Sequence, residues 1–195
     1  MRRGTGVLLA AALCFALLPR ADAAEVTVSA QSAVLMEAES GRVLYAKDAD
    51  TPRLIASTTK LMTALVALES GHSLEEDVTI PAEAAGVEGS SLYLKTGETV
   101  KLKTLLYGML LHSGNDAATA VALTCAGSLK AFAQKMNEKA QQLGMTNSHF
   151  TNPTGLDGEE HYSSAYDMAL LARACLDVPE LKEITATRST TMEGR

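Results

Sequence analysis

The sequence predicts an α+β protein in which short strands come first and a cluster of helices follows. Short apolar runs separated by glycine-bearing turns occupy residues 33–46 and 78–101, and segments with helical apolar periodicity occupy most of residues 102–176. Of the 195 residues, 47% are hydrophobic and 21% are charged, which provides enough apolar surface for one folded domain. The net charge of −6 argues against a nucleic-acid partner, because nucleic-acid binders usually carry a basic face.

The first 23 residues have the three parts of a secretory signal peptide. A basic start with Arg2 and Arg3 precedes the apolar run Val7–Leu18, and the A-x-A pattern at Ala21–Ala23 provides a cleavage site. We therefore expect residues 1–23 to be removed and residues 24–195 to form the mature domain. The chain is expected to be exported across the cytoplasmic membrane, to the periplasmic or extracellular face of the cell envelope.

The expected strands lie in the first half of the mature chain. Ala33–Met36 and Arg42–Ala46 flank a turn with Gly41 and predict a β-hairpin. Residues 47–56 form a polar loop. Three more short strands are expected in a glycine-punctuated region, at Val78–Ile80, Ser91–Leu94 and Glu98–Lys101.

Five helices are expected from apolar periodicity and cap residues. One covers Ser57–Glu69, and another covers Ser128–Leu143 and ends at Gly144, since glycine favours the left-handed conformation that follows a helix. Ser164 and Asp167 resemble an N-cap residue and its partner. The other helices are expected at Leu102–Leu111, from Asn115 or Asp116 to about Cys125, and from Ser164 to Leu176, with weak order after Pro179.

The tetrapeptide Ser57-Thr58-Thr59-Lys60 is an S-x-x-K motif at the start of the first expected helix. The spacing places the serine hydroxyl and the lysine amine on one helical face. Serine is a weak nucleophile until a base takes its proton, and lysine serves as that base only when its pKa falls. The motif favours acyl transfer through an acyl-enzyme, but alone it also fits an N-cap serine followed by a surface lysine.

Ser113-Gly114-Asn115 supports the catalytic interpretation, since it lies on a tight turn between two expected helices. A second hydroxyl can relay a proton between the lysine, the first serine and the leaving amine. The asparagine amide can bind a substrate amide. The same residues could also cap the helix that begins at Asp116, and the two roles are compatible.

Sequence blocks along most of the chain point to one family. They are Ala33–Glu37, Gly41–Tyr45, Ala56–Thr63, Gly89–Leu94, Ser113–Ala118, Met136-Asn137, Leu143-Gly144, His149–Pro153, Gly155–Asp157 and Tyr162–Met168. In this order, the blocks resemble the secreted low-molecular-mass penicillin-binding proteins that act as serine-type D-alanyl-D-alanine carboxypeptidases. The similarity covers about residues 33–176, so it is far more specific than either short motif.

The resemblance implies the transpeptidase fold of penicillin-binding proteins and β-lactamases, with a helical cluster packed on an antiparallel sheet. It implies that Ser57 is the acylated nucleophile, Lys60 the general base, Ser113 part of the second catalytic box and Asn115 a substrate-binding residue. The implied substrates are peptidoglycan stem peptides ending in D-Ala-D-Ala, and the implied covalent inhibitors are β-lactam antibiotics. No metal and no organic cofactor is implied.

The third box of this family, K-T-G, lies on a strand downstream of the second box. Here Lys95-Thr96-Gly97 precedes Ser113, and we interpret it as an ordinary turn. We therefore expect the 195 residues to be the N-terminal part of a longer enzyme, with an incomplete sheet and with poor activity or folding alone. Loss of a single oxyanion donor costs about 10²–10³ in rate. In relatives, a later C-terminal region also holds the enzyme at the membrane surface.

Two other functions stay open. A class A β-lactamase needs a deacylating glutamate in an E-x-x-L-N context, which Glu159-Glu160 lack because His161-Tyr162-Ser163 follows. A truncated, non-catalytic remnant would bind cell-wall peptides without forming a covalent adduct.

The histidines and cysteines are expected to have structural roles. The four histidines lack metal-ligand spacing, and His161 is expected on the surface or in a loop, although it could line the cleft. Cys125 and Cys175 are expected as buried apolar residues on helices, although an exported protein could also pair them.

Overall fold

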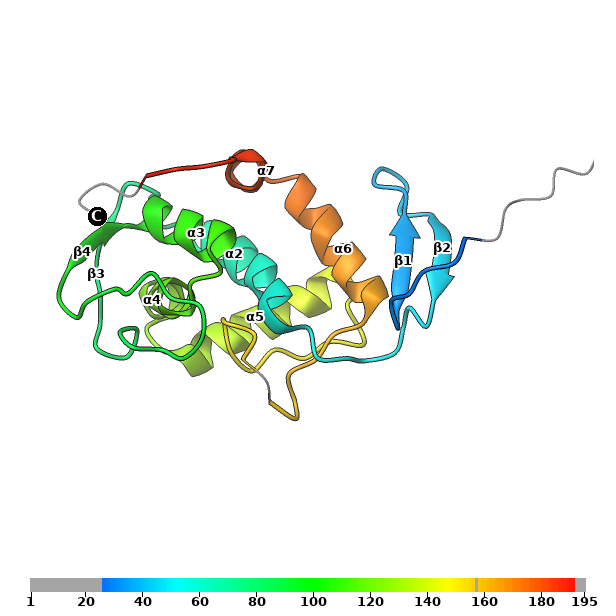
Figure 1. Ribbon diagram of the computed structural model, residues 1–195, viewed down its shortest axis with the longest axis horizontal. Coiled ribbons are helices and arrows are strands. Elements are labelled where there is room, and N and C mark those ends of the chain that lie inside the picture. Colours follow the sequence, from blue (N-terminus) through cyan, green and yellow to red (C-terminus); the bar gives the residue numbers. More distant parts are fainter. Residues whose placement is uncertain (1–25, 157, 192–195) are drawn as a thin grey trace, which may run out of the picture.

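The computed structural model describes residues 26–156 and 158–191. The predicted signal peptide at residues 1–23 lies outside this range. The described residues form six α-helices, one 3₁₀ turn and two antiparallel sheets of two strands each, which confirms the α+β prediction. Figure 1 shows the helices in the middle of the molecule and one hairpin at each end. None of the described helices is both long and apolar enough to cross a membrane.

The predicted N-terminal hairpin is confirmed. Strand β1 (Ala33–Met36) pairs with the antiparallel strand β2 (Val43–Lys47). The guanidinium group of Arg173 donates hydrogen bonds to the carbonyl oxygens of Ala38 and Glu39, at 2.7 and 2.8 Å. These bonds attach the turn of the hairpin to the helical part of the molecule.

The second hairpin consists of β3 (Asp77–Thr79) and β4 (Thr99–Lys101), which also pair antiparallel. Two of the three strands expected in this region are therefore present. The strand predicted at Ser91–Leu94 is wrong, because this segment is a loop. Its N–H groups at positions 92 and 94 donate to the Asp116 carboxylate at 3.0 Å, and not to a neighbouring strand.

The five predicted helices are confirmed. They are α2 (Lys60–Leu68), which follows the 3₁₀ turn Ala56–Thr59, α3 (Leu102–Leu111), α4 (Asn115–Ala126), α5 (Leu129–Leu143) and α6 (Ala165–Leu176). Ser128 caps α5 by accepting from the Ala131 N–H, and Ser164 caps α6 by accepting from the Asp167 N–H, both at 3.1 Å. Gly144 adopts the left-handed conformation at the end of α5.

The segment after Pro179 is more ordered than predicted. Helix α7 (Pro179–Ala186) begins with a proline, which has no backbone N–H. The first turn tolerates this, because N–H groups at that position have no acceptor within the helix. Leu181 and Ile184 are buried, and α7 contacts α3 and α6. The prediction of weak order is wrong here because this apolar pair, three residues apart, packs against neighbouring helices.

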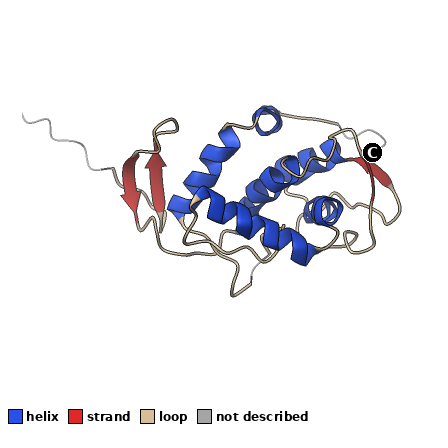
Figure 2. Cartoon of the chain, turned by 180° about the vertical axis from the view of Figure 1, so that it is seen from behind, coloured by secondary structure: helices blue, strands red, loops and turns tan. Residues whose placement is uncertain are grey.

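Helix α4 lies at the centre of the helical part. Its side chains are mostly alanine and threonine, and their small size allows α2, α3 and α5 to pack against it. The described strands form two separate hairpins, which Figure 2 shows at opposite ends of the helical cluster, in agreement with the expected incomplete sheet. Cys125 and Cys175 are buried and free, as predicted, and burial raises the pKa of both thiols.

Candidate active site

The candidate active site begins at a strained turn. The 3₁₀ turn Ala56–Thr59 leads directly into α2, so that Lys60 is the first residue of the helix. Ala56 has a φ of 45°, in the left-handed region that residues other than glycine rarely adopt. The turn leaves Ser57 exposed, whereas Lys60 is only 2% exposed. A surface hydroxyl and an interior amine therefore meet at the start of one helix.

Lys60 connects three parts of the chain. Its Nζ atom lies 3.1 Å from Ser57 Oγ, 2.7 Å from Asn115 Oδ1 and 2.7 Å from the Thr154 carbonyl oxygen. Amide and carbonyl oxygens can only accept hydrogen bonds. When Lys60 loses a proton, its two remaining N–H groups can stay on these two oxygens. The lone pair of the amine then faces the Ser57 hydroxyl.

The surroundings of Lys60 lower its pKa and so increase the fraction of neutral amine. Burial lowers the pKa of Lys60 from 10.5 to about 8, because the charged form loses its hydration. The three groups that accept its hydrogen bonds are all uncharged. At neutral pH, Lys60 is therefore neutral in a fraction on the order of one tenth of the molecules.

Asn115 is oriented by the loop between β3 and β4. Its Nδ2 donates to the Glu88 carbonyl oxygen at 2.6 Å, and its backbone N–H donates to the Ser90 carbonyl oxygen at 2.7 Å. Because Nδ2 needs an acceptor, Oδ1 is the end that faces Lys60. The structure thus places Asn115 beside the predicted base, and both ends of its amide have protein partners. Its predicted contact with substrate stays a prediction.

Ser113 lies two residues before Asn115, on the turn between α3 and α4. Its φ of 59° is left-handed, so this backbone is strained for a serine. Among the described residues, no hydrogen bond joins the Ser113 hydroxyl to Ser57 or Lys60. The structure therefore brings Ser57, Lys60 and Asn115 together, and the role of Ser113 stays a prediction.

The loop Thr151–Leu156 is a part of the site that the sequence did not reveal. The N-P-T-G sequence predicts a turn, but nothing in the pattern indicates that the Thr154 carbonyl oxygen faces Lys60. Gly155 has a φ of 82°, and a Cβ atom there would lie 1.9 Å from the Ala56 carbonyl oxygen. Glycine is therefore required where this loop crosses the turn before α2.

His161 is the second part of the site that the sequence did not reveal. His161 lies in a loop, which is one of the predicted alternatives, but it is not on the surface, because it is 1% exposed. Its Nε2 lies 2.8 Å from Thr59 Oγ1, and its ring meets Phe150 edge-on at 5.8 Å between centroids. A lone histidine between polar residues carries no sequence signal of this burial, which depends on packing between distant segments.

Lys95-Thr96-Gly97 is an ordinary turn, as predicted. All three residues are exposed, and Gly97 has a left-handed φ of 83° and donates to the Ile80 carbonyl oxygen at 2.9 Å. None of the four strands among the described residues contains a K-T-G sequence.

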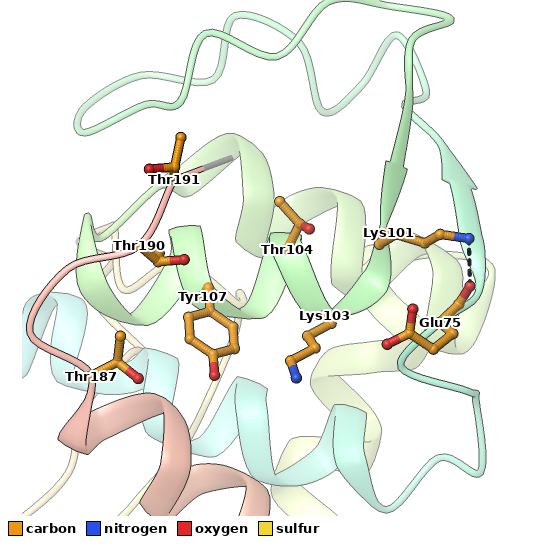
Figure 3. Close-up of a pocket in the computed structure, with 8 residues that line it drawn as sticks. All are labelled: Glu75, Lys101, Lys103, Thr104, Tyr107, Thr187, Thr190 and Thr191. Carbon is orange, nitrogen blue, oxygen red and sulfur yellow. Dashed lines mark hydrogen bonds between the residues drawn. The ribbon is translucent and has the colours of Figure 1, made fainter. Parts of the chain in front are cut away.

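The cavity shown in Figure 3 is lined by none of the predicted site residues. It has a volume of about 410 Å³, and its lining comes mainly from β4, α3 and the segment after α7. Lys101 pairs with Asp77 at 2.7 Å and donates to the Glu75 carbonyl oxygen at 2.8 Å, and Lys103 pairs with Glu183 at 3.4 Å. Carboxylates hold both lysines as cations, so this cavity lacks a serine–base pair.

Solved structures with the same fold define the class of protein. The crystal structure of D-alanyl-D-alanine carboxypeptidase from Mycobacterium tuberculosis H37Rv matches with a TM-score of 0.84 and 32% identity, over 91% of this chain and 68% of that one. Penicillin binding protein 6B from Escherichia coli matches with a TM-score of 0.83 and 34% identity, over 88% of this chain and 57% of that one. The fold is therefore that of the penicillin-binding proteins.

Within this class, the family is also defined. A family model for D-alanyl-D-alanine carboxypeptidases, peptidase family S11, matches residues 19–195, so the chain belongs to this family. D-alanyl-D-alanine carboxypeptidase DacF from Bacillus subtilis is 39% identical over 96% of this chain and 51% of that protein. DacA from Escherichia coli K12 is 39% identical over 95% of this chain and 51% of that protein. The chain spans about half the length of these curated relatives.

Proposed function

We propose that the full-length protein is a serine-type D-alanyl-D-alanine carboxypeptidase that removes the terminal D-Ala from peptidoglycan stem peptides. The observation that carries this proposal is the set of contacts around Lys60. The buried amine donates to two oxygens that can only accept, and the Ser57 hydroxyl is its third hydrogen-bond partner. Family membership supports the substrate class.

In the proposed acylation step, neutral Lys60 takes the proton of Ser57 while the serine oxygen attacks the carbonyl carbon of the penultimate D-Ala. The C–N bond to the terminal D-Ala breaks, and the proton passes to the leaving amine, with Ser113 as the proposed relay. Asn115 is the proposed contact for a substrate amide. Water then attacks the ester, which releases the shortened peptide and restores Ser57.

Ser57 is also the proposed target of β-lactam antibiotics. Attack on the lactam carbonyl opens the ring, and the former leaving amine stays tethered to the acyl group. The adduct therefore persists where a peptide product would depart. Stem peptides lie outside the cytoplasmic membrane, so the protein is proposed to act in the cell envelope.

The test uses the full-length protein with a fluorescent penicillin and, separately, with a peptide ending in D-Ala-D-Ala. We expect covalent label on Ser57 and release of one D-Ala per peptide, and we expect neither with Ser57→Ala. Ser70→Ala is the matched control, because Ser70 bonds the Ala67 carbonyl oxygen at the far end of α2. Its labelling should equal that of the wild type.

Other outcomes point elsewhere. A folded wild type that neither labels nor releases D-Ala contradicts the proposal. Rapid release of hydrolysed penicillin favours the β-lactamase alternative. Binding of stem peptides that survives in Ser57→Ala, without any covalent adduct in the wild type, favours the non-catalytic alternative.

A further inference from the structure

The buried His161 lies between two segments that surround Lys60. Resting on the function proposed above, we propose that His161 is a positioning residue that holds the loop Thr151–Leu156 against the start of α2. In this role it keeps the Thr154 carbonyl oxygen on Lys60 and does not touch the substrate.

The hydrogen bonds of His161 define which ring nitrogen carries the proton. Nδ1 lies 3.1 Å from the backbone nitrogen of Thr151, whose N–H can only donate, so Nδ1 accepts and carries no proton. In the neutral ring the proton is therefore on Nε2, which donates to Thr59 Oγ1 at 2.8 Å. One imidazole thus joins the residue before Lys60 to the first residue of the loop.

The loop beyond Thr151 is shaped so that one carbonyl faces α2. Asn152 Oδ1 accepts from the N–H groups of Thr154 and Gly155, at 3.1 and 2.8 Å, which closes a tight turn. Thr63 Oγ1, one turn further along α2 than Lys60, donates to the Pro153 carbonyl oxygen at 2.7 Å. The loop therefore contacts α2 at Lys60 and Thr63, and His161 fixes its first residue.

The loop also shields Lys60 from water, since Thr154 is itself buried against it. Within the described part of the chain, the hydrogen-bond partners of the Lys60 amine belong to Ser57, Asn115 and Thr154 and carry no charge. Glu159 and Glu160, which precede His161, are exposed. If the loop loosens, water reaches the amine, and its pKa returns toward the ordinary value of 10.5.

The hydrogen-bond and ring partners described for His161 are uncharged. They include the hydroxyls of Thr59 and Thr151, the Asn152 amide and the edge of the Phe150 ring. The expected influence of His161 on Lys60 is therefore transmitted by position and by exclusion of water, and not by a charge on these groups.

The test follows Lys60 directly, by the pH dependence of its ¹³Cε resonance in the full-length protein. His161→Phe fills the space of the ring without its hydrogen bonds, Thr59→Val removes the hydroxyl, and His161→Gln can still accept and donate. We expect the titration midpoint near 8 in the wild type and in His161→Gln, and a midpoint raised toward 10.5 in His161→Phe and Thr59→Val. The double variant should rise no further than either single one. His149→Phe is the matched control and should leave the midpoint unchanged.

Acylation by penicillin provides the second readout. If the midpoint rises by about 1, the rate at pH 7 should fall about tenfold and recover above pH 9, which mere loss of stability does not produce. An unchanged Lys60 midpoint in a folded His161→Phe overturns the positioning role. If His161→Phe does not fold, an unchanged midpoint in Thr59→Val overturns it instead. A raised midpoint together with a wild type that never acylates keeps the positioning role and rejects the proposed function.

Discussion

Lys60 and Lys103 are the same side chain in opposite surroundings. Lys60 is buried, its hydrogen-bond partners among the described residues are neutral oxygens, and burial lowers its pKa to about 8. The Lys103 side chain is 43% exposed, and its nitrogen lies 3.4 Å from the Glu183 carboxylate, whose hydrogen bond raises its pKa. A carboxylate partner keeps a lysine protonated, whereas burial among neutral acceptors lets a lysine lose its proton and act as a base.

The carboxylate that follows Asn115 in the sequence is held away from Lys60. Asp116 follows Asn115 directly, but its oxygens accept from the N–H groups of Leu92 and Leu94 and from the Ser91 hydroxyl. Burial alone raises the pKa of Asp116, yet these hydrogen bonds lower it overall, so that the anion is stable. The charge organises the loop and does not pair with Lys60, whose described partners are neutral.

The largest expected effect comes from removing the base. Lys60→Ala should lower the rate of Ser57 acylation by about 10²–10⁴-fold, which is the usual contribution of a general base. The measurement is the rate of labelling by fluorescent penicillin at neutral pH. Lys103→Ala removes a lysine of the other kind and should leave this rate within about twofold. Equal losses in both variants would contradict the contrast between the two lysines.

A carboxylate placed beside Lys60 should raise its pKa, as the Glu183 carboxylate does for Lys103. Asn115→Asp keeps the shape of the side chain but puts a carboxylate at the 2.7 Å contact. An adjacent opposite charge should raise the pKa of Lys60 by about 1–3, and acylation at pH 7 should fall about 10- to 10³-fold. The loss should diminish as the pH is raised toward 10. A loss that is constant across pH would mean that Asn115 acts only on the substrate.

Two glycines allow a test of how closely the loop Thr151–Leu156 packs on the turn before α2. Gly155 lies at this contact, and Gly144 serves as the control. Both have a left-handed φ, but a Cβ at Gly155 meets the Ala56 backbone, whereas a Cβ at Gly144 meets nothing within 4 Å. Gly155→Ala should lower the free energy of unfolding by about 2–5 kcal/mol, and Gly144→Ala by about 1–2 kcal/mol. Urea denaturation measures both. Equal losses of unfolding free energy in the two variants would show that the loop is not tightly packed on the turn before α2.

The smallest effect is the dependence of stability on pH. The pKa of Lys60 is lowered by folding, so between about pH 8 and 10.5 the unfolded chain binds the extra proton and stability rises with pH. Relative to Lys60→Met, the wild type should gain about 1–3 kcal/mol across this window. Denaturation series at pH 7.5 and 10.5 give the difference. A relative loss over the same interval would have the wrong sign for a buried amine.

Local patterns predict much of the fold. The N-caps Ser128 and Ser164 and the terminating Gly144 are short-range signals, and the helices they delimit are present. The segment Ser91–Leu94 resembles a strand in sequence, because its alternation of residues does not reveal that the distant Asp116 carboxylate takes its N–H groups. Helix α7 is not predicted because its order depends on packing against α3 and α6.

In the candidate site too, contacts between residues close in the sequence are predicted, and contacts between distant residues are not. The spacing of Ser57 and Lys60 along one helix predicts their proximity, and their nitrogen and oxygen atoms are 3.1 Å apart. The contacts of Thr154 and His161 are not predicted, since these residues reach α2 and the turn before it from 94 and 102 residues away. A backbone carbonyl carries no side-chain identity, so its position opposite an amine cannot be read from a motif.

The most direct test of Lys60 as a buried base is the pH dependence of Ser57 acylation in the full-length wild type. If Lys60 is the base, the penicillin labelling rate should rise with pH to a plateau, with its midpoint near 8. A rate that is flat from pH 6 to 9, or a midpoint near 10.5, would mean that Lys60 is not the buried base of this site.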